Sequence, residues 1–428
     1  MNGLLRLAYS AAGRVANALT HVVPASDGKI TRSLGARRGV TERFEAWGRA
    51  KRDRRRGLLW LHAPSVGEGL QARPVVDLLR AHRPDVQVAF TFFSPSAESF
   101  ARELDVDFAD YLPFDTASDV RRTIDALHPT ALVYAKLDVW PVLTEAAAAS
   151  GVRLGLVSGT VSRGSSRQRG IANALLHDAY ACLDAVGAVS DDDASRLISL
   201  GVRREVVRVT GDSRYDQVVA RAHGVDRSSA LLAPLASERP TLVAGSTWPS
   251  DERVLLAAWL DLRAAVPDAR LLIAPHEPTS DHLAFIESWA ADHQISVARL
   301  GAPNQSSAEV VVVDRVGVLG DLYALATVAF VGGGFHDAGL HSVLEPAAYG
   351  APVVFGPRHT NSRDAVLLQE ADGGVSVRDA AATEDVFIRW LGTPDSARAA
   401  GELARDVVRS GVGAAARSFA LVERLLQH

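Results

Sequence analysis

The 428-residue sequence predicts an α/β fold of two successive, doubly wound, Rossmann-like domains. Short apolar runs alternate with amphipathic helical patterns, which is typical of parallel sheets that carry helices on both faces. The alternation occurs in two series, separated near residues 215–240 by a polar stretch rich in Ala and Ser that contains Pro234 and Pro240. The length leaves each series enough residues to bury a core of its own.

The first series starts after Gly57. Its candidate strands are residues 58–62, 86–93, 131–135, 154–158 and 206–211, with helical patterns at 70–80 and 139–149. The second series has candidate strands at residues 241–245, 270–275, 310–314, 328–332 and 352–356. In doubly wound sheets, ligands bind at the carboxyl ends of the strands, so we expect two domains that face a central cleft.

These elements divide the chain into five parts. We expect a basic N-terminal segment, a first Rossmann-like domain, a linker, a second Rossmann-like domain and terminal helices that cross back to the first domain. The corresponding boundaries are residues 1–56, 57–215, 216–240, 241–395 and 396–428.

The segment 1–56 is strongly basic. It holds thirteen Lys and Arg against four Asp and Glu, although the whole chain has a net charge of −4. Its apolar side chains include a set that lies close to one helical face: Leu4, Leu7, Ala8, Ala11 and Val15. The stretch is too weakly apolar for a span, and the pattern favours a helix lying in the interface of an anionic membrane. A solvated basic segment is the alternative, and nucleic acid is not expected because interleaved aromatics are missing.

Two compositional features exclude other classes of site. Cys182 is the single cysteine, so the chain forms no intrachain disulfide and no cysteine zinc site, which fits a reducing compartment. The acidic run Asp191-Asp192-Asp193 follows Ser190 and precedes a helical pattern. We interpret it as the acidic first turn of a capped helix rather than a metal site.

The loop 62–69 is the first candidate for chemistry, because it joins a strand to a helix and contains a carboxylate. Glu68 is placed to accept a proton from a substrate hydroxyl as a general base. A helix N-terminus would lower its pKa, and the alternative is that Glu68 only caps the helix. Ser65 and Gly67 in the same loop are candidates for contacts with the acceptor.

Several motifs resemble those of bacterial 3-deoxy-D-manno-octulosonic acid (Kdo) transferases. His62-Ala63-Pro64-Ser65-Val66-Gly67-Glu68 is similar to the HAxSVGE loop of that family. Further similar stretches occur in the family's order: Tyr111–Asp115 (YLPxD), Lys136–Pro141 (ETExWP), Ala244–Thr247 (AGST) and residues 330–357, the most specific block. The resemblance covers roughly residues 57–370.

The resemblance implies a GT-B fold and an inverting transfer of Kdo from CMP-Kdo to lipid IVA or a related lipid A precursor. It implies that Glu68 is the catalytic base, that CMP-Kdo is a co-substrate, and that neither a cofactor nor a metal is needed. The enzyme would act at the cytoplasmic face of the bacterial inner membrane, with peripheral or monotopic attachment and without a nucleic acid partner.

The resemblance also assigns a donor site to the second domain. Gly245, Ser246 and Thr247 open a helix whose free N–H groups suit a phosphate, although ordinary helix caps look the same. Gly333 and Gly334 would let the backbone approach the donor. The remaining candidates are polar: His341 and Ser342 as donors, Glu345 for the ribose hydroxyls, and His276 and Arg358 for carboxylate or phosphate, or as structural residues.

The chain departs from the family at three places. Lys136 replaces the first glutamate of the acidic box, in which Asp138 remains, and it is one of only three lysines. Thr160 stands where the family has an arginine, two residues before Ser162, so Arg163 or Arg167 would have to substitute. Ser342 replaces an asparagine. We expect Lys136, Asp138 and Ser162 to shape the acceptor side.

Two other interpretations stay open. One is another GT-B enzyme, such as a UDP-sugar transferase or a UDP-N-acetylglucosamine 2-epimerase. The other is a non-catalytic paralogue that binds lipid A or a nucleotide; the missing arginine favours it, and Glu68 and Glu345 count against it.

Overall fold

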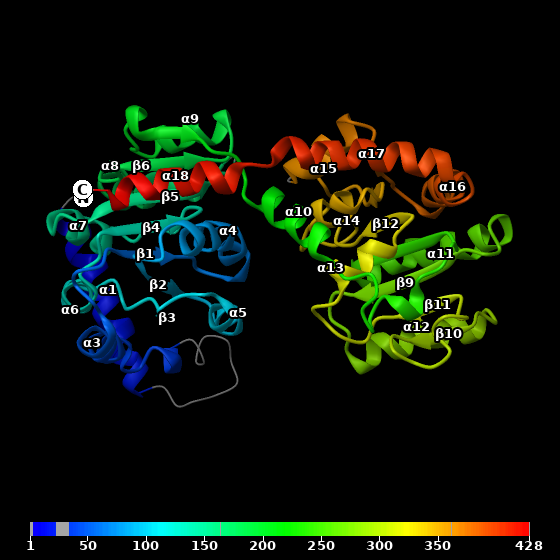
Figure 1. Cartoon of the computed structure of the whole chain (residues 1–428), viewed down its shortest axis with the longest axis horizontal. Helices are drawn as coiled ribbons and strands as arrows, with labels where there is room; N and C mark the ends of the chain where they lie inside the picture. The colour runs from blue at the N-terminus through cyan, green and yellow to red at the C-terminus, as the bar shows by residue number, and fades with distance from the viewer. Residues whose placement is uncertain (1–2, 23–33, 163, 361, 428) are drawn as a thin grey trace. The chain divides into compact units, whose positions relative to one another are not determined.

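The computed structural model describes residues 3–22, 34–162, 164–360 and 362–427. The chain forms two compact units (Figure 1). Unit 1 extends to Gln217 and also takes the residues from Val412 onward, and unit 2 comprises Val218–Gly411. Each unit contains a seven-stranded sheet in which all strand pairs are parallel, which confirms the predicted doubly wound α/β class.

The sheet of unit 1 has the order β3-β2-β1-β4-β5-β6-β7. Its strands are β1 (Leu58–His62), β2 (Gln87–Phe92), β3 (Phe108–Tyr111), β4 (Ala131–Ala135), β5 (Arg153–Gly159), β6 (Ala185–Ala188) and β7 (Val207–Val209). Its helices are α1 (Gly3–Val22), α3 (Val40–Lys51), α4 (Val66–His82), α5 (Ala97–Glu103), α6 (Ala117–Leu127), α7 (Pro141–Ala149), α8 (Gly170–Ala181), α9 (Asp191–Ser199) and α18 (Ala414–Leu426). Helix α10 (Arg214–Gly224) leads into unit 2.

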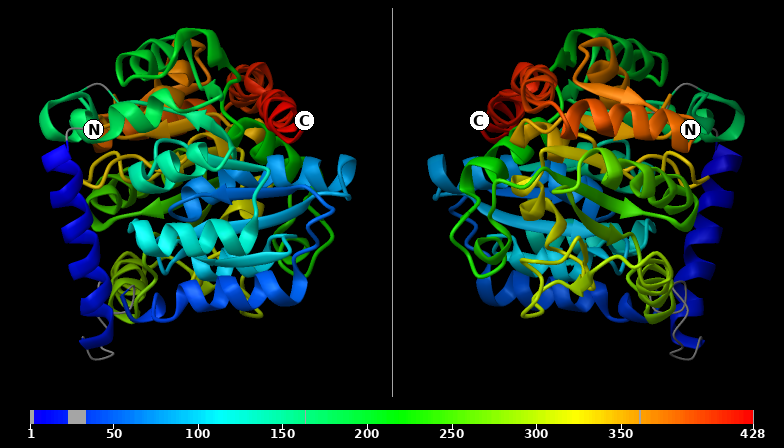
Figure 2. Two further views of the ribbon diagram at one scale, coloured as in Figure 1. Left: turned by 90° about the vertical axis from the view of Figure 1, so that its left-hand side faces the viewer. Right: turned by 90° about the vertical axis from the view of Figure 1, so that its right-hand side faces the viewer.

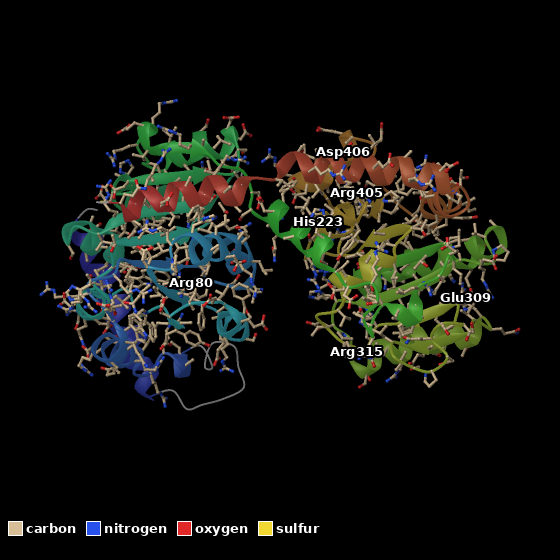
Figure 3. The ribbon with its side chains drawn as sticks, in the orientation of Figure 1. Arg80, His223, Glu309, Arg315, Arg405 and Asp406 are labelled. Carbon is tan, nitrogen blue, oxygen red and sulfur yellow. The ribbon has the colours of Figure 1, made fainter. Side chains whose placement is uncertain are left out.

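Helix α18 belongs to unit 1 although it ends the chain. It packs with α4 over β4, β5 and β6 (Figure 1). Leu425 approaches Gly155 of β5 so closely that a Cβ there would lie 2.6 Å from its side chain. Arg80 of α4 (labelled in Figure 3) holds the start of β3 through Asp107 at 2.7 Å. The last helix therefore completes the cover of the sheet.

The sheet of unit 2 has the order β10-β11-β9-β8-β12-β13-β14. Its strands are β8 (Thr241–Thr247), β9 (Arg270–Pro275), β10 (Val297–Arg299), β11 (Val310–Val312), β12 (Val328–Val331), β13 (Val353–Phe355) and β14 (Gly374–Ser376). Its helices are α11 (Pro249–Ala265), α12 (Ser280–Asp292), α13 (Leu319–Leu322), α14 (Leu344–Tyr349), α15 (Arg363–Glu370), α16 (Ala380–Leu391) and α17 (Pro394–Gly411). Arg405 of α17 (labelled in Figure 3) fastens it to α14 by donating to the Tyr349 carbonyl at 2.7 Å.

The structure differs from the predicted boundaries in the linker and at the C-terminus. Residues 216–240 are not an open linker, because they contain most of α10 and two leucines, Leu232 and Leu235, that are fully buried in unit 2. Of the terminal helices expected to cross back, α17 packs on α14 and α16 of unit 2, and only α18 lies on unit 1. The prediction also missed four strands, namely β3, β6, β10 and β14.

The basic N-terminal segment is not a separate part either. Helix α3 packs on α6 and buries Val40, Thr41 and Phe44. Its neighbouring arginines bind protein oxygens: Arg43 reaches Asp110 at 2.6 Å, and Arg52 donates to the Leu127 carbonyl at 2.7 Å. These two arginines therefore stabilise unit 1 itself. Composition alone could not show whether basic residues of this segment bind protein oxygens or lipid.

Helix α1 runs along unit 1 (dark blue in Figure 2). The Tyr9 hydroxyl donates to Asp115 at 2.8 Å, and Gly13 lies against Thr116 at the start of α6. Ala8, Ala11 and Val15 of the predicted apolar face are exposed, and the side chains of Leu4 and Leu7 lie outside the described residues. No helix in the described ranges has both the length and the apolar character needed to cross a bilayer.

Candidate active site

A cavity of about 360 Å³ opens at the carboxyl ends of β1, β4 and β5 in unit 1. It is lined by Pro64, Glu68, Lys136, Leu137, Asp138, Thr160, Ser162, Ser165 and Arg167. The structure thus brings together four of the predicted site residues, Glu68, Lys136, Asp138 and Ser162, from three separate loops. Such an edge is where doubly wound sheets bind ligands.

Glu68 lies in the first turn of α4 and is held by two partners. Ser65 donates a short hydrogen bond to one carboxylate oxygen, and Lys136 Nζ lies 3.0 Å from the other. Burial raises the pKa of the Glu68 carboxyl, but Ser65 and Lys136 outweigh it, so the pKa lies below its ordinary value. The carboxylate is therefore ionised at neutral pH, and it keeps 16% of its side chain exposed to the cavity.

Lys136 has an unusual backbone conformation, with φ at 65° immediately after β4. A residue with a Cβ seldom adopts this region, and such strain persists where the surrounding structure enforces it. Here the Lys136 N–H donates to the Val157 carbonyl of β5 at 2.8 Å. The turn carries the ammonium group into the cavity, where 44% of the side chain remains exposed.

Asp138 is surrounded by donors. His62 Nε2 lies 2.9 Å from the carboxylate, Trp140 Nε1 lies 3.0 Å from it, and Arg167 approaches at 3.7 Å. Burial raises the pKa of Asp138, but His62, Trp140 and Arg167 lower it by more, so the net shift is downward. Asp138 is therefore a fixed negative charge beside Glu68 and Lys136.

His62, on β1, is fully buried and orients Asp138 through the contact of its Nε2 with the carboxylate. Trp60 Nε1 donates to Thr91 Oγ1 at 3.0 Å, and Thr91 Oγ1 in turn lies 3.0 Å from His62 Nδ1. Because the indole can only donate, the Thr91 hydroxyl proton is free for Nδ1, which leaves the ring proton on Nε2 facing Asp138. The sequence motif contained His62 but gave no sign of this relay.

The family arginine missing at Thr160 has a counterpart in space. Arg167, on the single turn Ser166–Gln168, lines the same cavity as Thr160 and Ser162. Arg163, the other candidate, lies outside the described residues. Gly67 does not line the cavity, and a Cβ there would meet only Ser65 Oγ at 3.8 Å, so no contact within the chain requires glycine.

In unit 2, the loops after β8 and β12 meet around one buried carboxylate. Asp251, in the first turn of α11, accepts the backbone N–H groups of Trp248 at 2.9 Å, Gly333 at 2.8 Å and Phe335 at 3.0 Å. It is fully buried. The carboxylate therefore locks the start of α11 to the glycine-rich loop that follows β12.

Four aromatic rings gather above this junction. Trp248 stacks on His276 with centroids 4.6 Å apart and on His336 at 4.1 Å. His341 lies 4.5 Å from His276 and receives the Trp248 indole N–H at 3.3 Å. His276 and His341 were predicted donor-site residues, whereas the sequence gave no reason to include Trp248 or His336.

The predicted glycines serve packing within the chain. A Cβ at Gly245 would lie 2.1 Å from the Tyr323 hydroxyl, one at Gly333 2.1 Å from the Gly339 carbonyl, and one at Gly334 2.4 Å from the Gly356 nitrogen. Thr247 is fully buried and donates its hydroxyl to Glu252 at 2.7 Å. Its side chain is thus engaged within unit 2, and Ser246, with φ at 53°, is the more open member of that turn.

The other predicted donor-site residues lie at the same end of the sheet. Glu345 lies in the first turn of α14, and burial raises the pKa of its carboxyl while Arg221 opposes the rise. Ser342 is exposed just before that helix. Arg358 donates its backbone N–H to Gly334 at 2.9 Å and pairs its exposed guanidinium with Asp337.

Comparisons with known proteins agree with this architecture. A family model described as 3-deoxy-D-manno-octulosonic-acid transferase (kdotransferase) matches residues 38–217. The 3-deoxy-D-manno-octulosonic acid transferase of Bordetella pertussis is 31% identical over 85% of this chain and 86% of its own length. That of Haemophilus influenzae is 25% identical over 91% of this chain and 92% of its own.

Among solved structures, the UDP-GlcNAc 2-epimerase of Neisseria meningitidis has a TM-score of 0.63 at 14% identity, covering 87% of this chain and all of that one. At this identity the likeness shows the fold alone, and the fold is of the GT-B type. The sequence matches decide the family within that fold. The chain belongs to the 3-deoxy-D-manno-octulosonic acid transferase family.

Proposed function

We propose that this protein transfers Kdo from CMP-Kdo to a sugar hydroxyl of lipid IVA, or of a related lipid A precursor, in lipopolysaccharide synthesis. Family membership supports the Kdo donor and the lipid A type of acceptor. The observation that carries the mechanism is the position of Glu68, which Ser65 and Lys136 hold in a cavity that Asp138 and Arg167 also line. An acidic, phosphorylated acceptor needs such cations, and the reaction needs such a base.

In the proposed transfer, the acceptor hydroxyl oxygen bonds to the anomeric carbon of Kdo from the face opposite CMP. Glu68 takes the hydroxyl proton, and the bond between the anomeric carbon and the phosphate oxygen breaks with its electron pair on CMP. Lys136 and Ser65 keep Glu68 ionised until the acceptor arrives. Ser162 is exposed at the cavity and is the proposed hydrogen-bonding partner of the acceptor sugar.

We propose that unit 2 holds CMP-Kdo. His276, His341, Ser342 and Arg358 supply donors for its phosphate and carboxylate, backbone N–H groups around Ser246 add to them, and Glu345 accepts from the ribose. These groups meet the charge that develops on the leaving phosphate. Because these side chains would stabilise the charge on the leaving phosphate, we expect CMP-Kdo to act as co-substrate and the reaction to need no cofactor or metal.

We further propose that the protein attaches peripherally to the cytoplasmic face of the inner membrane. The exposed apolar side of α1, with Ala8, Ala11 and Val15, supports this, and Arg14 beside it is exposed as well. Small apolar residues next to a cation suit a helix that lies in the interface of an anionic membrane.

The test is a transfer assay with CMP-Kdo generated in place and lipid IVA, read by mass spectrometry. The wild type should add one or more Kdo units. Glu68→Gln should lower turnover by roughly 10²- to 10⁴-fold, the usual contribution of a general base, and leave CMP binding intact in calorimetry. Glu98→Gln is the matched control, because Glu98 also begins a helix and pairs with a cation, Arg102, away from the cavity.

Full activity of Glu68→Gln would remove Glu68 from the role of base. A wild type that binds CMP but forms no product from lipid IVA would contradict the proposed acceptor. Competition by UDP in place of CMP would contradict the proposed donor.

A further inference from the structure

Trp248 is the common partner of the three histidines of the donor site. Its ring stacks on His276 and on His336, with interplanar angles of 25° and 1°, and its indole N–H reaches His341 Nε2 at 3.3 Å. These four residues come from the carboxyl ends of three neighbouring strands, β8, β9 and β12. One side chain therefore touches every imidazole of the cluster.

The hydrogen bond to His341 determines where that ring carries its proton. An indole N–H only donates, so His341 Nε2 must accept, and the single proton of the neutral ring lies on Nδ1. Burial lowers the pKa of His341, the charges of His276 and His336 add to the lowering, and Asp251 opposes it. Among the described residues, these groups are the titratable neighbours that act on the ring, and their net effect lowers the pKa of His341, which favours the neutral ring at physiological pH.

The position of Trp248 is itself fixed by the backbone. Asp251 binds the Trp248 N–H and also the Gly333 and Phe335 N–H groups, which belong to the loop that carries His336 and His341. His276 donates its backbone N–H to the Thr247 carbonyl at 2.9 Å, directly beside Trp248. Hydrogen bonds and ring contacts thus hold the indole and the three imidazoles together.

We propose that Trp248 is a positioning residue of the donor site: it holds His341 as a neutral ring whose Nδ1–H donates to an anionic group of the activated sugar, and it aligns His276 and His336 beside it. This inference rests on the proposed donor site of unit 2. A ring fixed in this way offers the same hydrogen bond from pH 6 to 8, since it does not depend on the proton that a free histidine loses in that range.

Trp248→Phe tests the proposal because phenylalanine keeps a ring for stacking and removes only the N–H. His341 Nε2 then becomes free to take a proton, and the neutral ring distributes its proton over both nitrogens. The ratio of the variant's KM for CMP-Kdo to that of the wild type should rise between pH 6 and 8. At pH 8 it should reach roughly three- to ten-fold, the effect of one hydrogen bond, with kcat within about two-fold.

The structural readout is independent of transfer. Long-range ¹H–¹⁵N spectra of the full-length protein, with the His341 signals assigned by their loss in His341→Gln, should show the Nδ1–H form in the wild type and a mixture in Trp248→Phe. Trp289→Phe is the matched control, because Trp289 lies beside His293 with centroids 5.6 Å apart on α12 and should change neither readout.

An Nε2–H form of His341 in the wild type would overturn the proposal, and this result needs no variant. A constant KM ratio between pH 6 and 8, or a fall in kcat with KM unchanged, would overturn it as well. Because the spectra involve no substrate, the tautomer can be as inferred even if the enzyme proves to use a different donor, so failure of the two proposals can be told apart.

Discussion

Lys136 lies beside Glu68, the proposed base, with its Nζ 3.0 Å from the carboxylate. Its ammonium group is one of two neighbours that lower the pKa of Glu68 against the effect of burial. A carboxylate accepts a proton only when it is ionised, so under the proposed mechanism a lower pKa of Glu68 would extend activity toward acidic pH. The family's usual glutamate at position 136 would act in the opposite direction, by like-charge repulsion.

Lys136→Met should therefore raise the pKa of Glu68 and move the acid limb of the kcat/KM profile to higher pH. Activity at pH 6 should fall more than activity at pH 8. The measurement is the transfer rate from pH 5 to 9 under substrate-limited conditions. Lys51→Met is the control, since Lys51 is exposed at the end of α3. An acid limb that stays in place would show that Lys136 does not set this ionisation.

Arg167 lies in the cavity beside Thr160, the position at which the resemblance to the family would lead one to expect an arginine. It stands seven residues from Thr160 in the chain, yet both line the same cavity. Arg167→Met should raise the KM for lipid IVA by about ten-fold, as expected for a lost charged hydrogen bond. Arg169→Met, two residues further and exposed, should not.

Rescue sharpens this prediction. Adding Thr160→Arg to Arg167→Met returns an arginine to the family's position and should restore most of the affinity for the acceptor. A double variant no better than Arg167→Met, or a single variant with unchanged KM, would mean that Arg167 only buttresses Asp138.

At the scale of elements, the failure to predict β3 and β6 from the sequence has specific physical reasons. Strand β3 contains Asp110, whose polarity hid the pattern; Arg43 neutralises it at 2.6 Å. In strand β6, Val186 alone has a strong strand preference and the other residues are Ala and Gly; Gly187 is needed because a Cβ would lie 2.6 Å from Thr210 Oγ1. Short apolar runs identified the strands that were predicted, including the three-residue strands β7, β11 and β13, whereas β3 and β6 lack such a run and depend on their partners in the fold.

Some residues of the candidate site could likewise be predicted from the sequence and others could not. Glu68 was predictable from its motif and its place at a helix start. The relay of Thr91, His62 and Asp138 was not, because it depends on two strand registers. The register of β1 against β2 sets His62 opposite Thr91, and that of β1 against β4 sets His62 opposite Tyr134, near the end of β4 that leads to Asp138. The ring cluster at Trp248 likewise joins three loops, and spacing along the chain contains no information about such a meeting.

The contact between α3 and α6 gives a prediction for an element. A Cβ at Gly48 would lie 2.6 Å from the Ala126 carbonyl oxygen, which belongs to the α6 backbone and cannot turn aside. Gly48→Ala should lower the free energy of unfolding by about 1–3 kcal/mol, as overpacking does, despite the better helix propensity of alanine. Gly35→Ala, where an added Cβ meets nothing within 4 Å, should leave stability equal or slightly higher. Thermal and urea unfolding would measure both.

At the scale of the whole molecule, the stability of unit 1, which contains the first part of the chain, depends on helix α18 near residue 428. Val422 of α18 is fully buried in the core of unit 1. Val422→Asp would place a charge there and should cost several kcal/mol. Hydrogen exchange should then speed up in β4 and β5 while β8 and β9 stay protected. Leu403→Asp, on an exposed position of α17, should change neither set. Equal loss of protection in both units would show that they unfold together.

Because α18 follows unit 2 in the sequence but packs on unit 1, it also affects the order in which the two units can complete folding during synthesis. Unit 2 is contiguous in sequence, so it can fold as soon as Gly411 has left the ribosome. Unit 1 is synthesised first but lacks α18 until the whole of unit 2 has been made, and until then the apolar surfaces of β5 and α4 that α18 covers stay uncovered. A nascent chain of this enzyme therefore exposes its older half for the longer time, and that half is where a chaperone would have to bind.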